Sequence, residues 1–186
     1  MDHSDDLLAR LSAVAAAFPH RWPAVPESQI TRAEKALGFP LPPLFAALYT
    51  RVADGGWHPA GATGSDGELY PLETLVDDYQ RNRDPEEETP TDTRSAQALP
   101  EWPEGVVEIM NGGRFASLCL DCLDPAAPIL VRDVDIAESD SDVAWTVLAP
   151  SLADWLEDAL RGAEQAQDRS MCPAGANAAA SRAEPA

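Results

Sequence analysis

The chain has 186 residues, enough for one domain to bury a core without disulfides or a metal, and its 45% hydrophobic and 24% charged residues are ordinary for a globular protein. Its charge is unusual, because 32 acids against 13 Lys and Arg residues give a formal net charge of −19. Such a field repels nucleic acid and anionic membranes and attracts basic partners, although the alternative is that the carboxylates serve solubility alone.

No targeting or membrane segment is predicted. Residues 1–6 lack the positive region of a signal peptide, and the longest apolar run, Leu11 to Phe18, is too short to cross a bilayer. Three cysteines do not form a disulfide framework. We therefore expect a cytoplasmic protein that does not bind membranes.

Three short helices are predicted in the first third of the chain. Apolar residues at helical spacing predict one helix that ends near Pro19, a second over about Glu27–Leu37 that stops at Gly38, and a third over Leu44–Ala53. The turn Asp54-Gly55-Gly56 follows and uses residues that tolerate positive φ.

The middle of the chain is less regular. A glycine-rich loop over Gly55–Gly67 carries Trp57 and His58, and a short strand followed by a helix is predicted around Leu69–Tyr79. Residues of about 82–100 are polar, acidic and contain proline, which predicts an exposed or disordered insertion.

The last third is predicted to be a sheet and a closing helix. Gaps too short for crossover helices predict hairpin or meander connections between four apolar runs, which are Val106–Met110, Phe115–Leu123, Ile129–Arg132 and Val143–Leu148. The final helix begins at Ser151, with Asp154 as its capping-box partner, and Gly162 is predicted to stop it.

Together these elements predict an α+β fold, with three short N-terminal helices, a mostly antiparallel sheet in the C-terminal half and a closing C-terminal helix. One domain is expected over residues 1–162, and residues 163–186 are predicted to be a mobile tail.

The strongest candidate binding feature is a run of five acids with no base, formed by Asp133, Asp135, Glu138, Asp140 and Asp142. A calcium loop of the EF-hand type would need a glycine where Glu138 stands and a glutamate where Ala144 stands, so that motif is excluded. The run is either a solvated acidic loop or a face that meets a basic partner.

Other candidate sites have simpler structural explanations. Trp57 and His58 either contact a partner or cover the core. Cys119 and Cys122 fall within a predicted strand, so their side chains point to opposite faces, and no second pair completes a zinc site. The glycine-rich loop lacks the lysine of a P-loop. We expect no catalytic residues, because nucleophile, base and oxyanion donor cannot all be assigned. We also expect no metal site and no cofactor.

The order of motifs resembles the SUKH superfamily, also called the Smi/Knr cell-wall-regulator-like family, over roughly Pro26 to Leu160. The N-terminal half of the resemblance is Ile30-x-x-Ala33-Glu34-x-x-Leu37-Gly38-x-x-Leu41-Pro42, then Leu44 to Val52 and Asp54-Gly55-Gly56. The C-terminal half is Gly112-Gly113, Leu118-Cys119-Leu120-Asp121, Ile129-Leu130-Val131 and Ser151-Leu152-x-x-Trp155-Leu156. Asp54, where the family often has asparagine, and the insertion around Asp84 to Pro100 depart from the pattern.

The resemblance implies a non-catalytic α+β domain that acts through protein contacts. Many bacterial members are immunity proteins that neutralise toxins, and others regulate cell-wall assembly. Two hypotheses follow: an immunity-type inhibitor that binds a basic toxin domain, or an intracellular regulatory or scaffold protein with an endogenous partner. The sequence leaves the identity of the partner and the oligomeric state open.

Overall fold

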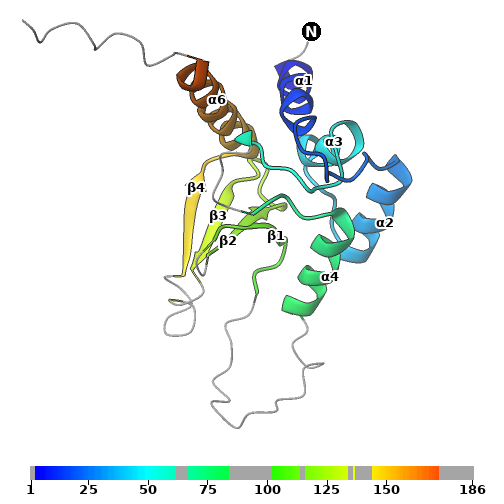
Figure 1. The fold of residues 1–186 in the computed structure, drawn as a ribbon. Coiled ribbons are helices and arrows are strands. Elements are labelled where there is room, and N and C mark those ends of the chain that lie inside the picture. The colour runs from blue at the N-terminus through cyan, green and yellow to red at the C-terminus, as the bar shows by residue number, and fades with distance from the viewer. Residues whose placement is uncertain are drawn as a thin grey trace, which may run out of the picture.

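The structure is a computed structural model that describes residues 3–61, 67–83, 102–113, 116–133, 136 and 144–171, without the side chains of residues 166–171. Most of the predicted acidic insertion and the chain beyond residue 171 lie outside the described residues. The described part contains helices and one antiparallel sheet, which confirms the predicted α+β class (Figure 1).

Helix α1 (His3–Ala15) buries one apolar face, formed by Leu7, Leu8, Leu11 and Ala15. It ends earlier than Pro19 predicts. The chain turns more tightly after Ala15, because the amide of Phe18 donates to the carbonyl of Ala15 three residues back, at 3.0 Å.

Helices α2 (Glu27–Leu37) and α3 (Pro43–Arg51) lie where the sequence predicts them. Gly38 ends α2 in the left-handed conformation at φ +88°, and its amide donates to the carbonyl of Glu34 at 2.9 Å. The carboxylate of Glu34 in turn accepts a bond from the amide of Leu41 at 3.0 Å, which fixes the connection to α3.

The segment before α4 (Leu72–Arg83) is an isolated bridge rather than the predicted strand. Leu69 pairs with Met110, and the amide of Tyr70 donates to the carbonyl of Ile109 at 2.9 Å. The pairing stops there because α4 begins two residues later.

Four strands form a single sheet in the order β1-β2-β3-β4, and each neighbouring pair is antiparallel. The strands are β1 (Val106–Asn111), β2 (Ala116–Asp121), β3 (Ile129–Asp133) and β4 (Trp145–Ala149). This confirms the predicted meander. In Figure 1 helices α1 to α4 lie on the β1 side of the sheet, and β4 forms the opposite edge.

The two faces of the sheet differ in burial. Val107, Leu120 and Ile129 form one row across three strands and are completely buried. The neighbouring row points to the opposite face and consists of Glu108, Cys119, Leu130 and Val147. We call this second face the Trp102 face, because the indole of Trp102 packs over it as described below.

Helix α6 (Leu152–Met171) closes the fold and begins with the predicted variant of a capping box. The amide of Asp154 donates to the hydroxyl of Ser151 at 3.1 Å, and that hydroxyl donates to the carboxylate of Asp154 at 2.7 Å. The prediction that Gly162 stops the helix is wrong, since α6 continues to Met171.

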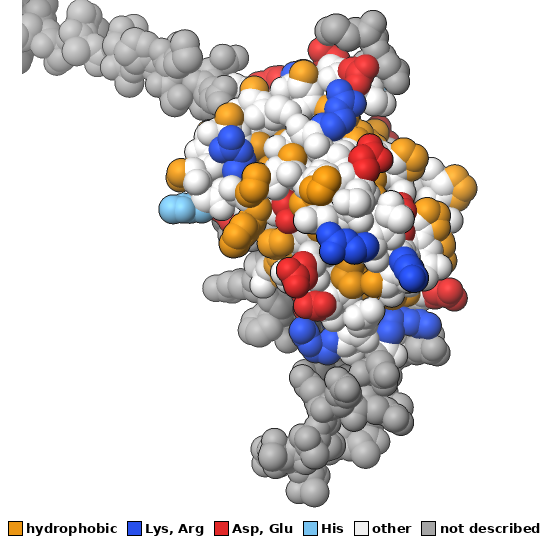
Figure 2. All heavy atoms as spheres, turned by 90° about the vertical axis from the view of Figure 1, so that its right-hand side faces the viewer, with side chains coloured by type: hydrophobic (Ala, Val, Ile, Leu, Met, Phe, Trp, Pro, Cys, Tyr) orange, Lys and Arg blue, Asp and Glu red, His pale blue; other side chains and the backbone are white. Residues whose placement is uncertain are grey.

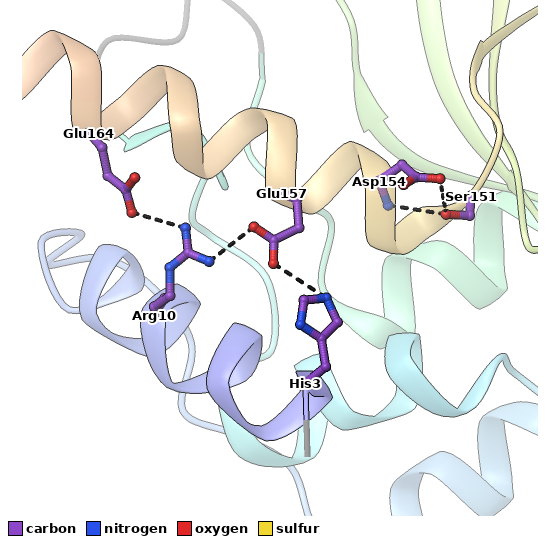
Figure 3. A network of polar contacts seen from close by, with 6 residues as sticks. All are labelled: His3, Arg10, Ser151, Asp154, Glu157 and Glu164. Atoms are coloured by element: carbon purple, nitrogen blue, oxygen red, sulfur yellow. Dashed lines mark hydrogen bonds and ion pairs between the residues drawn. The ribbon is translucent and has the colours of Figure 1, made fainter. Parts of the chain in front are cut away.

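Two contacts explain why α6 continues. Ala163 is buried, and Arg10 of α1 donates to both Glu157 and Glu164 at 3.0 Å each, which joins the helix to α1 on either side of Gly162 (Figure 3). His3 also lies 3.7 Å from Glu157. Tertiary contact therefore outweighs the weak helix propensity of one glycine.

Candidate protein-binding surface

Only the first residue of the predicted acidic run is described. Asp133 is the last residue of β3, is half-buried, and accepts a bond from the amide of Ile136 at 3.1 Å. Asp135, Glu138, Asp140 and Asp142 lie outside the described residues. In the sequence the run lies between β3 and β4, and β4 is an edge strand of the sheet.

The structure places Trp57 and His58 away from Asp133, the described residue of that run. Trp57 is completely buried in the core, and its carbonyl accepts a bond from the amide of Leu69 at 2.9 Å. Because Leu69 pairs with β1, Trp57 lies on the β1 side of the sheet and Asp133 on the β4 side. Burial favours the core-covering role for this indole.

His58 is half-buried, and its side chain forms a hydrogen bond within its own loop. Its Nδ1 atom accepts a bond from the amide of Ala60 at 3.0 Å. The indole Nε1 of the neighbouring Trp57, by contrast, is buried and has no hydrogen-bond partner among the described residues. The two residues therefore contribute chiefly to the loop and the core, and the structure does not bring them together with Asp133.

The exposed apolar residues of β4 are the feature that sequence reasoning missed. Val147 is 66% exposed and Leu148 is 52% exposed, whereas the remaining strands bury most of their apolar side chains. The run Val143–Leu148 has the composition of a core strand. Its position as the last strand of a predicted meander was the available signal, because a final strand lies at an edge.

An aromatic cluster covers the Trp102 face next to β4. The rings of Trp102 and Trp145 meet edge to face with centroids 5.3 Å apart, and Trp102 Nε1 donates to the carbonyl of Val106 at 2.6 Å. The guanidinium of Arg132 lies 5.1 Å from the Trp102 ring and 6.0 Å from the Trp145 ring. This cluster packs Trp145, the first residue of β4, against Trp102.

Further along the same face, Glu108 is a partly buried carboxyl group with polar partners. The hydroxyl of Tyr70 donates to its Oε1 at 3.3 Å. Burial raises the pKa of Glu108, while hydrogen bonds from Ser117 and Tyr70 and the charge of Arg132 oppose the shift. Burial also raises the pKa of Tyr70 to about 12, with Glu108 adding to the shift. The group is hydrogen-bonded within the fold and needs no ligand.

Cys119 and Cys122 are buried free thiols; Cys119 lies in β2 as predicted, whereas Cys122 follows the last residue of that strand, Asp121. Burial raises the pKa of both Cys119 and Cys122. Each therefore remains a neutral thiol at neutral pH, which is unsuited to nucleophilic or redox chemistry. Within the described part of the chain, no group of three His, Cys, Asp or Glu side chains could hold a metal ion.

The helical side of the molecule presents a mixed surface. Figure 2 shows Lys and Arg side chains among Asp, Glu and apolar side chains over this face, rather than one broad patch of a single sign. No helix in the described ranges is both long and apolar enough to cross a membrane. Although the chain has a net charge of −19, its acidic side chains do not form a single patch on the part of this face that Figure 2 shows.

Comparison with known proteins identifies the family of this chain. The family model described as SMI1 / KNR4 family (SUKH-1) matches residues 24–158, more than half of the chain. No curated protein matches significantly. The matched residues run from just before α2 through the sheet into α6, which are the elements that carry the predicted resemblance. The chain belongs to the SMI1/KNR4 (SUKH-1) family.

Proposed function

We propose that this chain is a non-catalytic protein-binding domain, an immunity-type inhibitor that binds and neutralises a basic toxin domain. Membership of the SMI1/KNR4 (SUKH-1) family is the observation that carries the proposal. The net charge of −19 supports a basic partner, because complementary charge raises the association rate and rejects acidic competitors.

The chemistry of the described side chains agrees with a binding role. The titratable groups with raised pKa values on the Trp102 face, Glu108 and Tyr70, are hydrogen-bonded to each other, and the thiols of Cys119 and Cys122 are buried and neutral. None of these groups is poised as a nucleophile beside a free base.

The first test is capture of partners with the tagged full chain from its source cells at low and high salt, followed by expression of each captured protein. A basic protein that arrests growth when expressed alone, and whose effect co-expression of this chain removes, is the expected result. An endogenous partner that is harmless alone would contradict the immunity role and favour the regulatory alternative.

The electrostatic part makes a separate prediction about rates. Replacing Asp133, Asp135, Asp140 and Asp142 with asparagine should slow association with the captured partner about tenfold at low salt and flatten its salt dependence. A matched control removes the same charge from exposed residues of the helical side and the adjoining loop, through Asp6→Asn, Glu68→Gln, Glu73→Gln and Asp77→Asn. Equal slowing by both variants, measured by stopped flow, would assign the effect to net charge alone.

A further inference from the structure

Strand β4 has an open edge. It pairs with β3 alone, and no further described strand lies on its other side (Figure 1). The amide of Asp133 donates to the carbonyl of Ala144 at 2.9 Å, so Ala144 faces β3. Backbone direction alternates along an antiparallel strand, which turns the N–H and C=O groups of Trp145 and Val147 toward the open side.

At the other edge of the sheet, strand β1 is paired with a neighbouring segment of the chain. Along β1, Leu69 pairs with Met110, and the amides of Gly67 and Tyr70 donate to carbonyls of the strand at 2.8 and 2.9 Å. The outward carbonyls of Ile109 and Asn111 at that edge are therefore satisfied by the chain itself. No such cover is present over β4 within the described residues.

Strand β4 also lacks most devices that protect edges. Natural edge strands usually carry a charged residue or a proline, and the five residues Trp145–Ala149 contain neither. One irregularity is present, since the pairing with β3 shifts between Ile129 and Leu130 and leaves Leu148 as the extra residue. The regular open stretch is therefore short and centred on Thr146.

The side chains at this edge suit an apolar strand. Val147 lies on the Trp102 face beside Leu130 and is 66% exposed, and Leu148 is 52% exposed. Trp145, held against Trp102, extends the apolar strip toward the start of the strand. A strand added here would bury these side chains and satisfy the free backbone groups together.

Charge at the ends of β4 indicates the chemistry of the added strand. Asp133 lies beside Ala144 at the start, and the exposed Asp154 opens α6 after the strand ends. Arg132 of β3 is a basic residue next to β4. Its guanidinium lies over the rings of Trp102 and Trp145, and the negative charge of Glu108 offsets its positive charge. A segment with an apolar centre and basic ends matches this arrangement.

We propose that the open edge of β4, formed by Trp145, Thr146, Val147 and Leu148, binds an extended segment of a protein partner by strand addition, with apolar residues over Val147 and Lys or Arg residues at both ends. The inference rests on the proposed protein-binding function and names its surface. A second copy of the chain is a poorer occupant, because it would bring together two molecules of net charge −19.

The test uses the full chain and a synthetic peptide that has two lysines at each end and alternating threonine and valine between them. Amide hydrogen exchange should slow at least tenfold at Trp145 and Val147 when the peptide binds. The amide of Thr146, which faces β3, serves as a control in the same strand and should not change. Protection of Trp145 and Val147 in the free protein would overturn the proposal, because the edge would already be covered.

Three further probes separate strand addition from general attraction. A peptide with N-methylated backbone should bind at least tenfold more weakly, as should one with glutamates in place of lysines. Val147→Pro should weaken binding similarly and remain folded by circular dichroism, because the N–H that it removes makes no bond to β3. Val147→Thr keeps that N–H and should bind within about threefold of the parent chain. Equal binding of the N-methylated peptide would overturn the proposal.

The two proposals fail separately. If Val147→Pro still binds and neutralises a captured toxin at full strength, the edge is not the binding surface while the immunity function stands. If the lysine peptide protects Trp145 and Val147 but no captured partner is toxic, the edge inference stands and the immunity function is wrong.

Discussion

Gly55 and Gly38 both have positive φ, but their surroundings differ. Gly55 has φ +74°, and an added Cβ would lie 2.6 Å from backbone atoms of Leu69, Tyr70 and Pro71. Gly38 has φ +88° with open space around it. The first position therefore requires glycine for two reasons and the second for one.

We expect Gly55→Ala to lower the free energy of unfolding by about 2 to 5 kcal/mol, because left-handed strain and overpacking add. Gly38→Ala should lower it by about 1 to 2 kcal/mol through left-handed strain alone. Urea denaturation followed by tryptophan fluorescence measures both. Equal losses would show that the Leu69–Pro71 segment moves aside without cost.

Asp54 combines a useful hydrogen bond with a costly charge. Its carboxylate accepts a bond from the amide of Leu72 at 2.7 Å, in the first turn of α4. Burial raises the pKa of Asp54, with Glu73 adding to the shift and the Leu72 amide opposing it. The ionised group therefore lowers stability above its folded pKa, and this cost decreases as the pH falls through that value toward the unfolded pKa.

Asp54→Asn should raise the free energy of unfolding at pH 7, because the amide oxygen keeps the bond to Leu72 without a desolvated charge. The advantage should shrink as the pH falls through the raised pKa of Asp54 and vanish below the ordinary aspartate value of about 3.9. Asp54→Ala loses the bond and should cost about 1 to 2 kcal/mol at pH 7. An asparagine variant less stable than the parent at pH 7 would contradict this account.

Helix α6 shows how contacts with another element extend a helix beyond a local stop signal. Gly162 is exposed inside the helix, and an added Cβ there would meet nothing within 4 Å. Arg10 of α1 joins Glu157 and Glu164 across this position. The helix therefore continues over a residue that would ordinarily end it.

Gly162→Ala should raise the free energy of unfolding by about 0.5 to 1 kcal/mol, because alanine loses less backbone entropy in a helix interior. The same substitution at Gly38 is expected to have the opposite sign. Thermal unfolding of both variants makes the comparison. A loss of stability at Gly162 would mean that α6 ends there in a left-handed turn, as the sequence alone predicts.

The whole molecule is built around one continuous core. A single cluster of buried side chains takes residues from α1, including Leu11, through Phe45 of α3 and Ile109 of β1 to Leu156 of α6. Trp57 is also part of this cluster. Within the described part of the chain, the helices and the sheet bury their apolar faces against one another in this one cluster.

We therefore expect residues 1–162 to unfold in one cooperative step. Helix content followed by far-ultraviolet circular dichroism and tryptophan burial followed by fluorescence should give the same midpoint in urea. Gly55→Ala should move both midpoints together. Two separated transitions would show that the predicted single domain contains two folding units.

Local sequence signals predicted much of this fold. The range of α2 follows from apolar spacing and from Gly38, whose lack of a Cβ permits the left-handed end of the helix. The capping box of Ser151 and Asp154 is likewise a property of four neighbouring residues. The meander follows because the gaps between strands are too short for anything but antiparallel pairing.

Long-range contacts could not be predicted in this way. Arg10 lies 147 residues from Glu157, and Tyr70 lies 38 residues from Glu108. Neither pairing leaves a mark in local spacing, so the extension of α6 and the buried carboxyl group appear only once the chain has folded.

Tertiary structure also explains why Val147 and Ile129 differ in burial. Both are apolar and β-branched, both lie in predicted strands, and their spacing gives no hint of a difference. One is 66% exposed and the other completely buried, because burial depends on which strand lies at an edge and which face the helices cover. Residue type and spacing determined the elements, while their assembly determined which apolar side chains stay exposed.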